Sequence, residues 1–222
     1  MSKGLFVTAT GTDVGKTYVT ALMVKKLREA GLSPGYYKAA LSGAVSVEDS
    51  DAGYVRRISG ISQPKETLLS YRYETPVSPH LAARLEGGSV ELDRVLADYR
   101  RVCGLCDFVT VEGSGGIVCP IRWDAERRLL LEDIIRALDL GAVVVADAGL
   151  GTINAVVTTV CYMQSRGIET KGVFLNRYTG GAMQEDNAAM VEALTGLPVL
   201  DRIAPGQADL NMDGAALAAL YR

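Results

Sequence analysis

Short apolar segments alternate with longer segments of helical periodicity along this chain. The apolar segments predict strands at residues 5–8, 35–37, 68–73, 108–111, 142–146, 172–175 and 198–200. The periodic segments predict helices at residues 16–30, 51–58, 79–86, 90–102, 129–138, 154–165, 183–194 and 212–220. Strands that are apolar throughout are typical of parallel sheets with both faces covered. The pattern therefore predicts an α/β fold, as one domain over residues 1–222, with a mostly parallel sheet and helices on both faces.

Composition narrows the classes of protein to consider. The 222 residues are 48% apolar and 22% charged, with a net charge of −3, which is typical of a soluble domain. Nucleic-acid-binding proteins usually carry a basic excess, and no apolar run reaches the roughly 18 residues of a membrane span. The N-terminus has no secretory h-region. We therefore expect a cytoplasmic protein that binds neither nucleic acid nor membranes.

The four cysteines do not form a recognisable metal site. Cys103 and Cys106 have C-x-x-C spacing, but Cys119 and Cys161 do not supply the second pair that a structural zinc site needs. We expect the cysteines mainly to be small, buried apolar residues with reduced thiols. The charged segment 122–128 is expected to be a solvated loop.

The first predicted strand leads into a glycine-bearing turn that opens a helix. This turn ends in Gly15-Lys16-Thr17, the last residues of the phosphate-loop pattern G-x-x-x-x-G-K-[ST], although Thr10 occupies the place of the first glycine. Backbone amides of such a turn wrap phosphate oxygens, and the helix start adds partial positive charge. Lys16 can reach the outer phosphates, and the Thr17 hydroxyl can bind magnesium. The segment predicts a site for nucleotide phosphates.

Other polar residues follow predicted strands, and ligands of parallel sheets bind at these strand ends. Lys38 can hold a second anion or be a surface lysine. Asp51 lies in an acidic run that is either solvated or binds magnesium. Glu112 ends a buried strand and precedes a glycine-rich segment, 113–116, which lets the backbone approach a ligand. A carboxylate at this place holds magnesium in phosphate-loop proteins.

Two later strand ends leave alternatives open. Residues 147–154 lead into a helix whose start can hold a carboxylate or phosphate, or they form a plain turn. Asn176 can pair with an adenine edge through its amide, or it can cap a helix. His80 is the single histidine, and no Ser or Cys pattern near it indicates a hydrolase triad.

Together these loops match the motifs of one family. Residues 9–17 read A-T-G-T-D-V-G-K-T against the family's G-T-D-T-x-V-G-K-T, and residues 35–43 read G-Y-Y-K-A-A-L-S-G against G-x-x-K-P-V-x-S-G. The further matches are Asp51, P-x-S-P-H at 76–80, V-E-G-x-G-G at 111–116, L-G-x-I-N at 150–154, and a strand-end asparagine at Asn176. The chain thus resembles the dethiobiotin synthetases, the ATP-dependent cyclo-ligases of biotin synthesis.

The resemblance implies a reaction and a set of roles. In that family 7,8-diaminopelargonate and CO2 form a carbamate, ATP phosphorylates it, and the second amine closes the ureido ring. The implied catalytic residues are Lys16, Lys38, Thr12 and Ser42, and the implied magnesium ligands are Thr17, Asp51 and Glu112. The implied nucleotide contacts are Asp13, Val14, Gly15, Lys16, Thr17, Glu112, Gly115 and Asn176. The implied substrate contacts are Thr12, Lys38, Ser42, Gly151 and Asn154.

The family is also a homodimer with substrate at the subunit interface. By resemblance, the helix start at 151–154 of the neighbouring subunit holds the carboxylate of the substrate. Ala9 and Gly11 replace the family's Gly and Asp, and we expect Gly11 to adopt a positive φ that Ala9 cannot. Ala39 replaces a proline. Asp201 replaces a frequent glycine in a tail that contacts the nucleotide base, and we expect it to alter base or ribose contacts.

Phosphate-loop switches of the ParA/MinD type are the main alternative. They usually carry an extra lysine early in the loop, which residues 9–13 lack, and the membrane-bound ones end in a basic amphipathic helix that we do not see here. Cobyrinic-acid amidases require a glutaminase domain for which this chain has no room. A non-catalytic nucleotide-binding module would not need Lys38, Ser42, Asp51 and Glu112 together.

Overall fold

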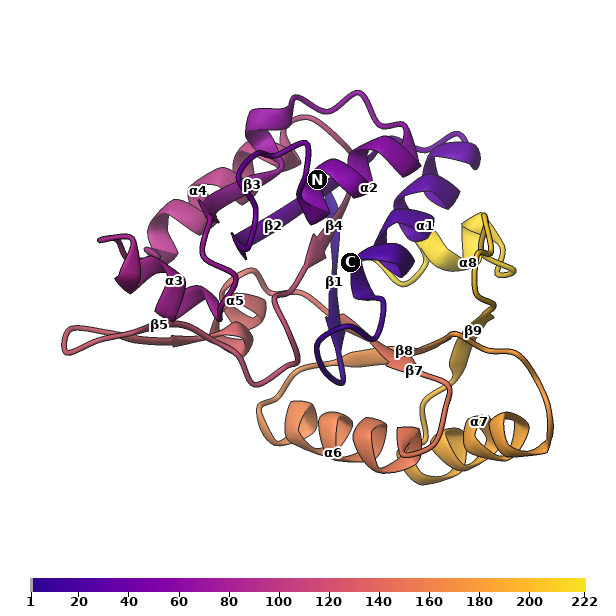
Figure 1. Cartoon of the computed structure of the whole chain (residues 1–222). Coiled ribbons are helices and arrows are strands. Elements are labelled where there is room, and N and C mark those ends of the chain that lie inside the picture. The colour runs from indigo at the N-terminus through magenta and orange to yellow at the C-terminus, as the bar shows by residue number, and fades with distance from the viewer. Residues whose placement is uncertain (1) are drawn as a thin grey trace.

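In a computed structural model, which describes residues 2–222, seven parallel strands form one sheet (Figure 1). Their order across the sheet is β3-β2-β4-β1-β7-β8-β9. The strands are β1 Lys3–Ala9, β2 Pro34–Ser42, β3 Leu69–Tyr73, β4 Phe108–Glu112, β7 Ala142–Asp147, β8 Thr170–Asn176 and β9 Val199–Ile203. Because all seven are parallel, their carboxyl ends and the loops that follow them lie at one edge of the sheet. The predicted α/β fold is confirmed.

Helices cover both faces of the sheet (Figure 1). One face carries α1 Lys16–Glu29, α2 Asp51–Ser59 and α8 Gly214–Ala218. The other carries α3 Pro79–Leu85, α4 Leu92–Cys103, α5 Leu131–Ala137, α6 Thr152–Ser165 and α7 Ala182–Thr195. A short 3-10 helix, η1 Lys65–Thr67, precedes β3. Among the described residues no helix is both long and apolar enough to span a membrane.

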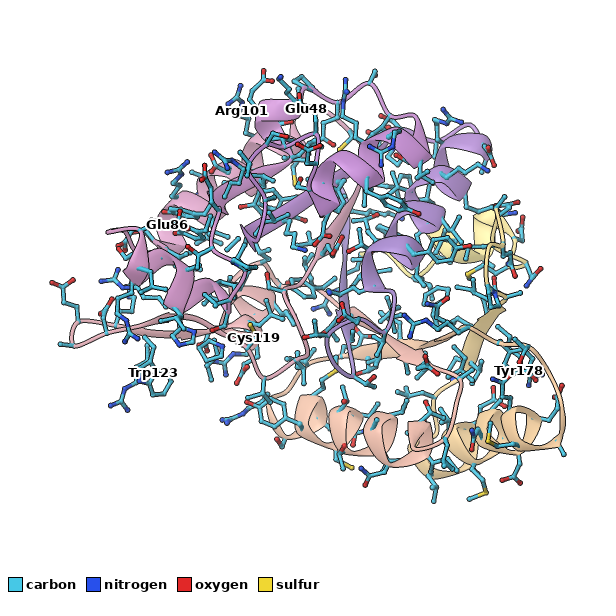
Figure 2. The ribbon with its side chains drawn as sticks, viewed as in Figure 1. Glu48, Glu86, Arg101, Cys119, Trp123 and Tyr178 are labelled. Carbon is cyan, nitrogen blue, oxygen red and sulfur yellow. The ribbon has the colours of Figure 1, made fainter. Side chains whose placement is uncertain are left out.

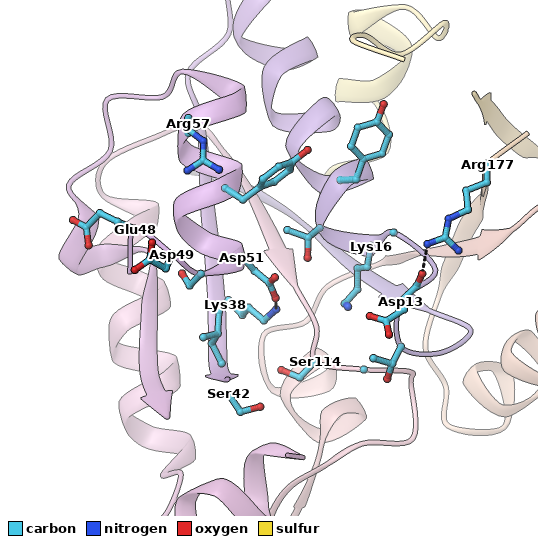
Figure 3. Close-up of a pocket in the computed structure, with 18 residues that line it drawn as sticks. Asp13, Lys16, Lys38, Ser42, Glu48, Asp49, Asp51, Arg57, Ser114 and Arg177 are labelled. Carbon is cyan, nitrogen blue, oxygen red and sulfur yellow. Dashed lines mark hydrogen bonds and ion pairs between the residues drawn. The ribbon is translucent and has the colours of Figure 1, made fainter. Parts of the chain in front are cut away.

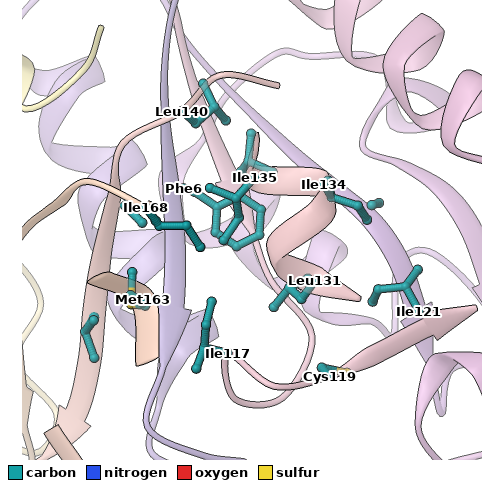
Figure 4. Packing of buried hydrophobic residues seen from close by; sticks show 14 of the residues in the cluster. Phe6, Ile117, Cys119, Ile121, Leu131, Ile134, Ile135, Leu140, Met163 and Ile168 are labelled. Atoms are coloured by element: carbon teal, nitrogen blue, oxygen red, sulfur yellow. The ribbon is translucent and has the colours of Figure 1, made fainter. Parts of the chain in front are cut away.

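The pleat of the strands explains why two cores form. In β1, Leu5 and Val7 pack with the residues under α1 and α8, whereas Phe6 points to the opposite face. There Phe6 contacts a cluster that includes Ile134 of α5 and Met163 of α6 (Figure 4). All five side chains are 0–1% exposed. Continuous apolar strands thus supply both cores at once.

The charged segment 122–128 is the expected solvated loop only in part: residues 123–128 are exposed, but Arg122 is buried and the ends of the segment lie in strands. Strands β5 Pro120–Trp123 and β6 Arg128–Leu130 pair as an antiparallel hairpin. The Arg122 side chain is only 8% exposed and forms ion pairs with Glu91, Asp124 and Glu126. Three carboxylates around one guanidinium make its burial tolerable. The helix expected at 129–138 accordingly begins only at Leu131. Trp123 projects from the hairpin (Figure 2) and is 46% exposed.

The cysteines fit their expected role only in part. All four are free thiols. Cys119 is buried, Cys103 and Cys106 are half-buried, and Cys161 is exposed. The expectation of small buried residues is therefore confirmed for Cys119 and wrong for Cys161. Burial raises the pKa of Cys106 to about 12, with Cys103 and Asp107 adding to the shift.

Candidate active site

The loop between β1 and α1 turns sharply before the helix begins. Asp13 has a φ of 60° and Gly15 a φ of 90°, so both lie in the left-handed region. Gly11 does not, and the expectation of a positive φ there is wrong. Gly15 is the N-cap of α1, and no side chain caps the first amides. Free amides at a helix start, with the positive end of the helix dipole, have the geometry of a phosphate site.

Asn176, at the end of β8, packs against this loop. Its side-chain amide donates to the carbonyl of Val14 at 2.9 Å. A Cβ on Gly15 would lie only 2.0 Å from Asn176 Nδ2, so the two residues fit together because Gly15 has no side chain. Asn176 is 4% exposed. It therefore holds the phosphate loop in place, while its reading of adenine stays a prediction.

Glu112, at the end of β4, is the buried centre of the site and is 1% exposed. Its Oε1 accepts hydrogen bonds from Thr17 Oγ1 at 2.8 Å and from Lys38 Nζ at 2.9 Å. Lys16 Nζ lies 4.0 Å from the same oxygen. Lys38 meets Glu112 because the two residues are directly paired in the register of β2 and β4. The pairing of β2 with β4 and the start of α1 thus bring three predicted site residues to one carboxylate oxygen.

Lys38 also donates to Asp51 Oδ2 (Figure 3). With its bond to Glu112, the Lys38 ammonium bridges two carboxylates. Lys38 is 3% exposed, which excludes the alternative of a surface lysine. Burial lowers the pKa of Lys38, but the opposite charges of Glu112 and Asp51 outweigh burial, and its pKa is raised. Burial raises the pKa of Asp51, but the charge of Lys38 lowers it further, and the net shift is downward. Lys38 and Asp51 are therefore both charged at neutral pH.

Lys16 is in a different electrostatic environment. Its pKa is lowered, mainly by burial, with Glu112 opposing the shift and the like charge of Lys38 adding to it. Lys16 and Lys38 together cancel the charges of Asp51 and Glu112. A bound triphosphate would add negative charge that these four groups do not offset, which favours a divalent cation.

The side chains around Thr17 are of the kinds that bind magnesium. Asp51 and Glu112 supply hard carboxylate oxygens and already enclose a cation, the Lys38 ammonium. Within residues 2–222 no cluster of three His, Cys, Asp or Glu side chains could hold a metal by itself. Phosphate oxygens would therefore have to complete the ligand set, as magnesium sites of this kind usually require.

A cleft of about 900 Å³ opens over these groups at the carboxyl edge of the sheet (Figure 3). Thr12, the expected substrate contact, and Gly115, the expected nucleotide contact, both line it, and the contacts themselves stay predictions. Ser42 also lines it, and its hydroxyl donates to the carbonyl of Val77 at 2.5 Å. Val77 belongs to the P-x-S-P-H segment, so this segment orients Ser42. His80 from the same segment lies outside the cleft.

Gly151 and Asn154 do not line the cleft of their own chain. They lie at the start of α6, where Gly151 has a φ of 91° and both residues are exposed. Leu150 beside them is 91% exposed. Asp201 does not line the cleft either. Its carboxylate accepts from the backbone and side-chain nitrogens of Asn211 at 2.7 and 2.8 Å, which ties the tail to β9.

Comparison with known proteins shows where the chain belongs. An AAA domain family matches residues 3–211. An ATP-dependent dethiobiotin synthetase BioD of Brachyspira hyodysenteriae is 44% identical over 207 residues, which cover 93% of this chain and 94% of that protein. A protein of the same name from Clostridium botulinum (strain Alaska E43) is 45% identical over 90% of this chain and 89% of its own length. The chain belongs to the dethiobiotin synthetase family.

Similarity to solved structures concerns the fold alone. The MinC:MinD complex of Aquifex aeolicus matches with a TM-score of 0.56 at 12% identity, over 91% of this chain and 81% of that one. A ParA family ATPase from Chlorobium tepidum matches with a TM-score of 0.52 at 14% identity, over 92% and 84%. These likenesses confirm a phosphate-loop NTPase-like fold. Because their identity is so low, they do not support the ParA/MinD alternative over membership of the dethiobiotin synthetase family.

The motifs of the dethiobiotin synthetase family did not indicate two residues of the site. Tyr36 donates from its hydroxyl to Glu112 Oε2 at 3.0 Å. Tyr36 lies two residues before Lys38 in β2, so strand periodicity placed it on the same face, and this signal was available. Arg177, with a φ of 58°, donates to Asp147 Oδ2 at 2.9 Å and to the carbonyl of Asp13 at 2.6 Å. No pattern in the sequence predicts these two contacts of the Arg177 side chain.

Proposed function

We propose that this protein is an ATP-dependent dethiobiotin synthetase acting on 7,8-diaminopelargonate and CO2. The observation that carries the proposal is the convergence of Lys16, Lys38 and Thr17 on Glu112, beside Asp51. Identities of 44–45% over most of the chain to named dethiobiotin synthetases support it. Residues 1–222 would act as a single catalytic domain.

The reaction brings two anions together. One amine of the substrate attacks CO2 and loses a proton, giving a carbamate. A carbamate oxygen then attacks the γ-phosphorus of ATP, and ADP leaves. The second amine attacks the carbonyl carbon of this mixed anhydride, so phosphate leaves, a proton is lost and the ureido ring closes. The phosphoryl transfer requires that the carbamate and the γ-phosphate approach each other despite their like charges.

The residues of the cleft suit these demands. Lys16 would contact the transferring phosphoryl group, and Lys38 would contact the carbamate and the phosphoryl group together. Thr12 and Ser42 would hold the diamine and the carbamate in line, which supplies acceleration by positioning. The amides of residues 13–15, with Gly115, would surround the phosphates. Asn176 would contact the adenine from its place behind the loop.

Magnesium would be held by Thr17, Asp51 and Glu112 together with phosphate oxygens. When bound, it would neutralise phosphate charge that the two lysines cannot offset alone. Because Lys38 bridges both carboxylates, a second cation at this place would free its ammonium for the carbamate. The network therefore suits an enzyme that handles both a metal–nucleotide and an anionic substrate.

We also propose a homodimer in the cytoplasm. The start of α6, with Gly151 and Asn154, is exposed and lies outside the cleft of its own chain. Its amides and helix dipole suit a carboxylate, so it would complete the substrate site of the neighbouring subunit. ATP is supplied in the cytoplasm, and the four free thiols suit its reducing conditions.

A single assay tests the proposed function. The protein is mixed with 7,8-diaminopelargonate, bicarbonate and Mg-ATP, and dethiobiotin is detected by mass spectrometry with ADP in equal amount. We expect ADP release to depend on the diamine, because the carbamate is the phosphoryl acceptor. Release of ADP without the diamine, or the absence of a cyclic product, would contradict the proposal, and diamine-independent hydrolysis would favour a ParA/MinD-like switch.

A further inference from the structure

The two carboxylate oxygens of Glu112 have different surroundings. Oε1 faces the phosphate loop and accepts from Thr17 at 2.8 Å and from Lys38 at 2.9 Å. Oε2 points away from the loop and accepts from the Tyr36 hydroxyl at 3.0 Å. Because Glu112 is 1% exposed, these side chains, rather than bulk water, stabilise its charge. The Tyr36 hydroxyl is thus the donor to the second oxygen, on the side of the carboxylate that Thr17 and Lys38 do not contact.

Tyr36 is held firmly enough to impose this choice. In the register of β2 and β4 it pairs with Thr110, two residues before the Lys38–Glu112 pair, so its side chain lies on the same face. The side chain is fully buried in the cluster formed by α1 and α2 residues. Gln63 accepts from its backbone N–H at 2.8 Å and donates to its carbonyl at 2.9 Å. Burial thus constrains the ring, and two hydrogen bonds to Gln63 constrain the backbone.

We propose that Tyr36 is a positioning residue for Glu112, whose hydroxyl fixes the rotation of the carboxylate so that Oε1 alone is presented to the metal–nucleotide. This inference rests on the proposed function only in taking a magnesium nucleotide as the ligand. Without the hydroxyl, Oε2 would be a buried acceptor with no donor. The carboxylate would then turn toward Thr17 and Lys38, and the magnesium-dependent part of nucleotide binding would weaken.

The next residue along β2 offers a matched control. Tyr37 is also fully buried, and its hydroxyl contacts Ser70 Oγ at 2.6 Å and the carbonyl of Val95 at 3.0 Å. It points to the opposite face of the sheet, and neither of these partners lines the cleft. Tyr37→Phe therefore removes an equally buried hydroxyl with two partners that lie outside the site.

The experiment is calorimetric titration of ADP into wild-type protein, Tyr36→Phe and Tyr37→Phe, with and without Mg²⁺. The readout is the factor by which Mg²⁺ raises ADP affinity. We expect Tyr36→Phe to reduce this factor about tenfold, near the low end for the loss of a hydrogen bond to a charged group. We expect Tyr37→Phe to leave the factor at the wild-type value. Neither variant should change metal-free ADP affinity.

Each other outcome would overturn the inference. If the Mg²⁺ factor is unchanged in Tyr36→Phe, or falls equally in both variants, Tyr36 is a structural residue only. Tyr37→Phe removes two hydroxyl contacts and Tyr36→Phe only one. If Tyr36→Phe alone fails to fold, Tyr36 is therefore needed for stability rather than for positioning Glu112, and the inference is overturned. A double-mutant cycle adds a second measurement: in a Glu112→Gln background, Tyr36→Phe should have no further effect on the Mg²⁺ factor.

The test is separate from that of the proposed function. ADP binding needs neither the diamine nor turnover, so the Mg²⁺ factor can be measured in a protein that makes no dethiobiotin. A wild-type protein with a large Mg²⁺ factor and no cyclic product would contradict the proposed function while leaving the Tyr36 comparison readable. A wild-type protein whose ADP affinity does not respond to Mg²⁺ would overturn the inference itself.

Discussion

At the scale of single residues, Lys38 neutralises two carboxylates and, by our proposal, binds the carbamate. The substitution Lys38→Ala tests both roles with different measurements. The Lys38 ammonium lies between Glu112 and Asp51, so Lys38→Ala leaves two neighbouring carboxylates without their cation. We expect a loss of about 3 kcal/mol in the free energy of unfolding, measured with urea, the low end for breaking a buried ion pair because Asp51 is part-exposed. Millimolar Mg²⁺ should restore part of this loss, and dethiobiotin formation should be abolished while Mg-ADP binding remains.

An exposed lysine provides the control for this prediction. Lys65 pairs with Glu48 at 2.8 Å, but both side chains are 62% exposed. Lys65→Ala should therefore change the free energy of unfolding far less than Lys38→Ala does, with no response to Mg²⁺. Equal losses for the two variants would mean that the Lys38 bridge contributes no more than a surface pair. Loss of Mg-ADP binding in Lys38→Ala would mean that Lys38 serves the nucleotide rather than the carbamate.

At the scale of elements, the ends of α1 test how the phosphate loop is built. Gly15 and Gly31 flank the helix with φ values of 90° and 77°. A Cβ on Gly15 would meet Asn176, whereas a Cβ on Gly31 would meet nothing within 4 Å. Both Ala variants carry the left-handed strain of about 1 kcal/mol, but only Gly15→Ala must displace Asn176. We expect ADP affinity, measured by calorimetry, to fall about tenfold or more in Gly15→Ala and to stay unchanged in Gly31→Ala.

Equal ADP affinities in the two glycine variants would show that the contact between Gly15 and Asn176 does not maintain the loop. Thermal unfolding of both variants separates the shared strain from the added clash. Gly15→Ala should have the lower midpoint, since it carries both costs.

Periodicity predicted the elements well where burial alone determines them. The helix expected at 16–30 is α1, Lys16–Glu29, and the strand expected at 142–146 is β7, Ala142–Asp147. The β5–β6 hairpin was missed because its stability depends on Arg122 meeting Glu91 as well as its own neighbours. An ion pair between residues 31 positions apart leaves no local pattern, so the whole segment was interpreted as a solvated loop, although only its exposed middle is one.

At the scale of the whole molecule, the site could be predicted as a set of residues but not as a network. Lys38 and Glu112 were identified as residues at strand ends, which is correct for Glu112 but wrong for Lys38, because β2 continues to Ser42. Only the register of β2 with β4 makes the two residues partners. The same register places Tyr36 beside Glu112, and the family motifs do not identify Tyr36 as a site residue. The reach of Arg177 to the carbonyl of Asp13 depends on the conformation of two loops. Such contacts depend on tertiary structure and cannot be predicted from the spacing of residues along the chain.

The proposed homodimer is a property of the whole molecule, and Leu150 tests it. A leucine that is 91% exposed beside the proposed substrate contacts Gly151 and Asn154 would bury its side chain against the neighbouring subunit. Burial of one leucine contributes about 2 kcal/mol, and a two-fold interface contains the residue twice. Leu150→Asp should therefore raise the dimer dissociation constant by about a thousandfold, as measured by sedimentation equilibrium.

Leu194, near the end of α7, is the matched control, since it is 55% exposed and distant in sequence from the α6 start. Leu194→Asp should leave the dissociation constant unchanged. In Leu150→Asp, Mg-ADP affinity should stay at the wild-type value, because the phosphate loop, Glu112 and Asn176 come from one chain, while the KM for the diamine should rise as the dimer dissociates. A wild-type chain that sediments as a monomer at micromolar concentration, or a Leu150→Asp dimer of unchanged affinity, would contradict this interface, and the substrate carboxylate would then have to be held by groups of the same subunit.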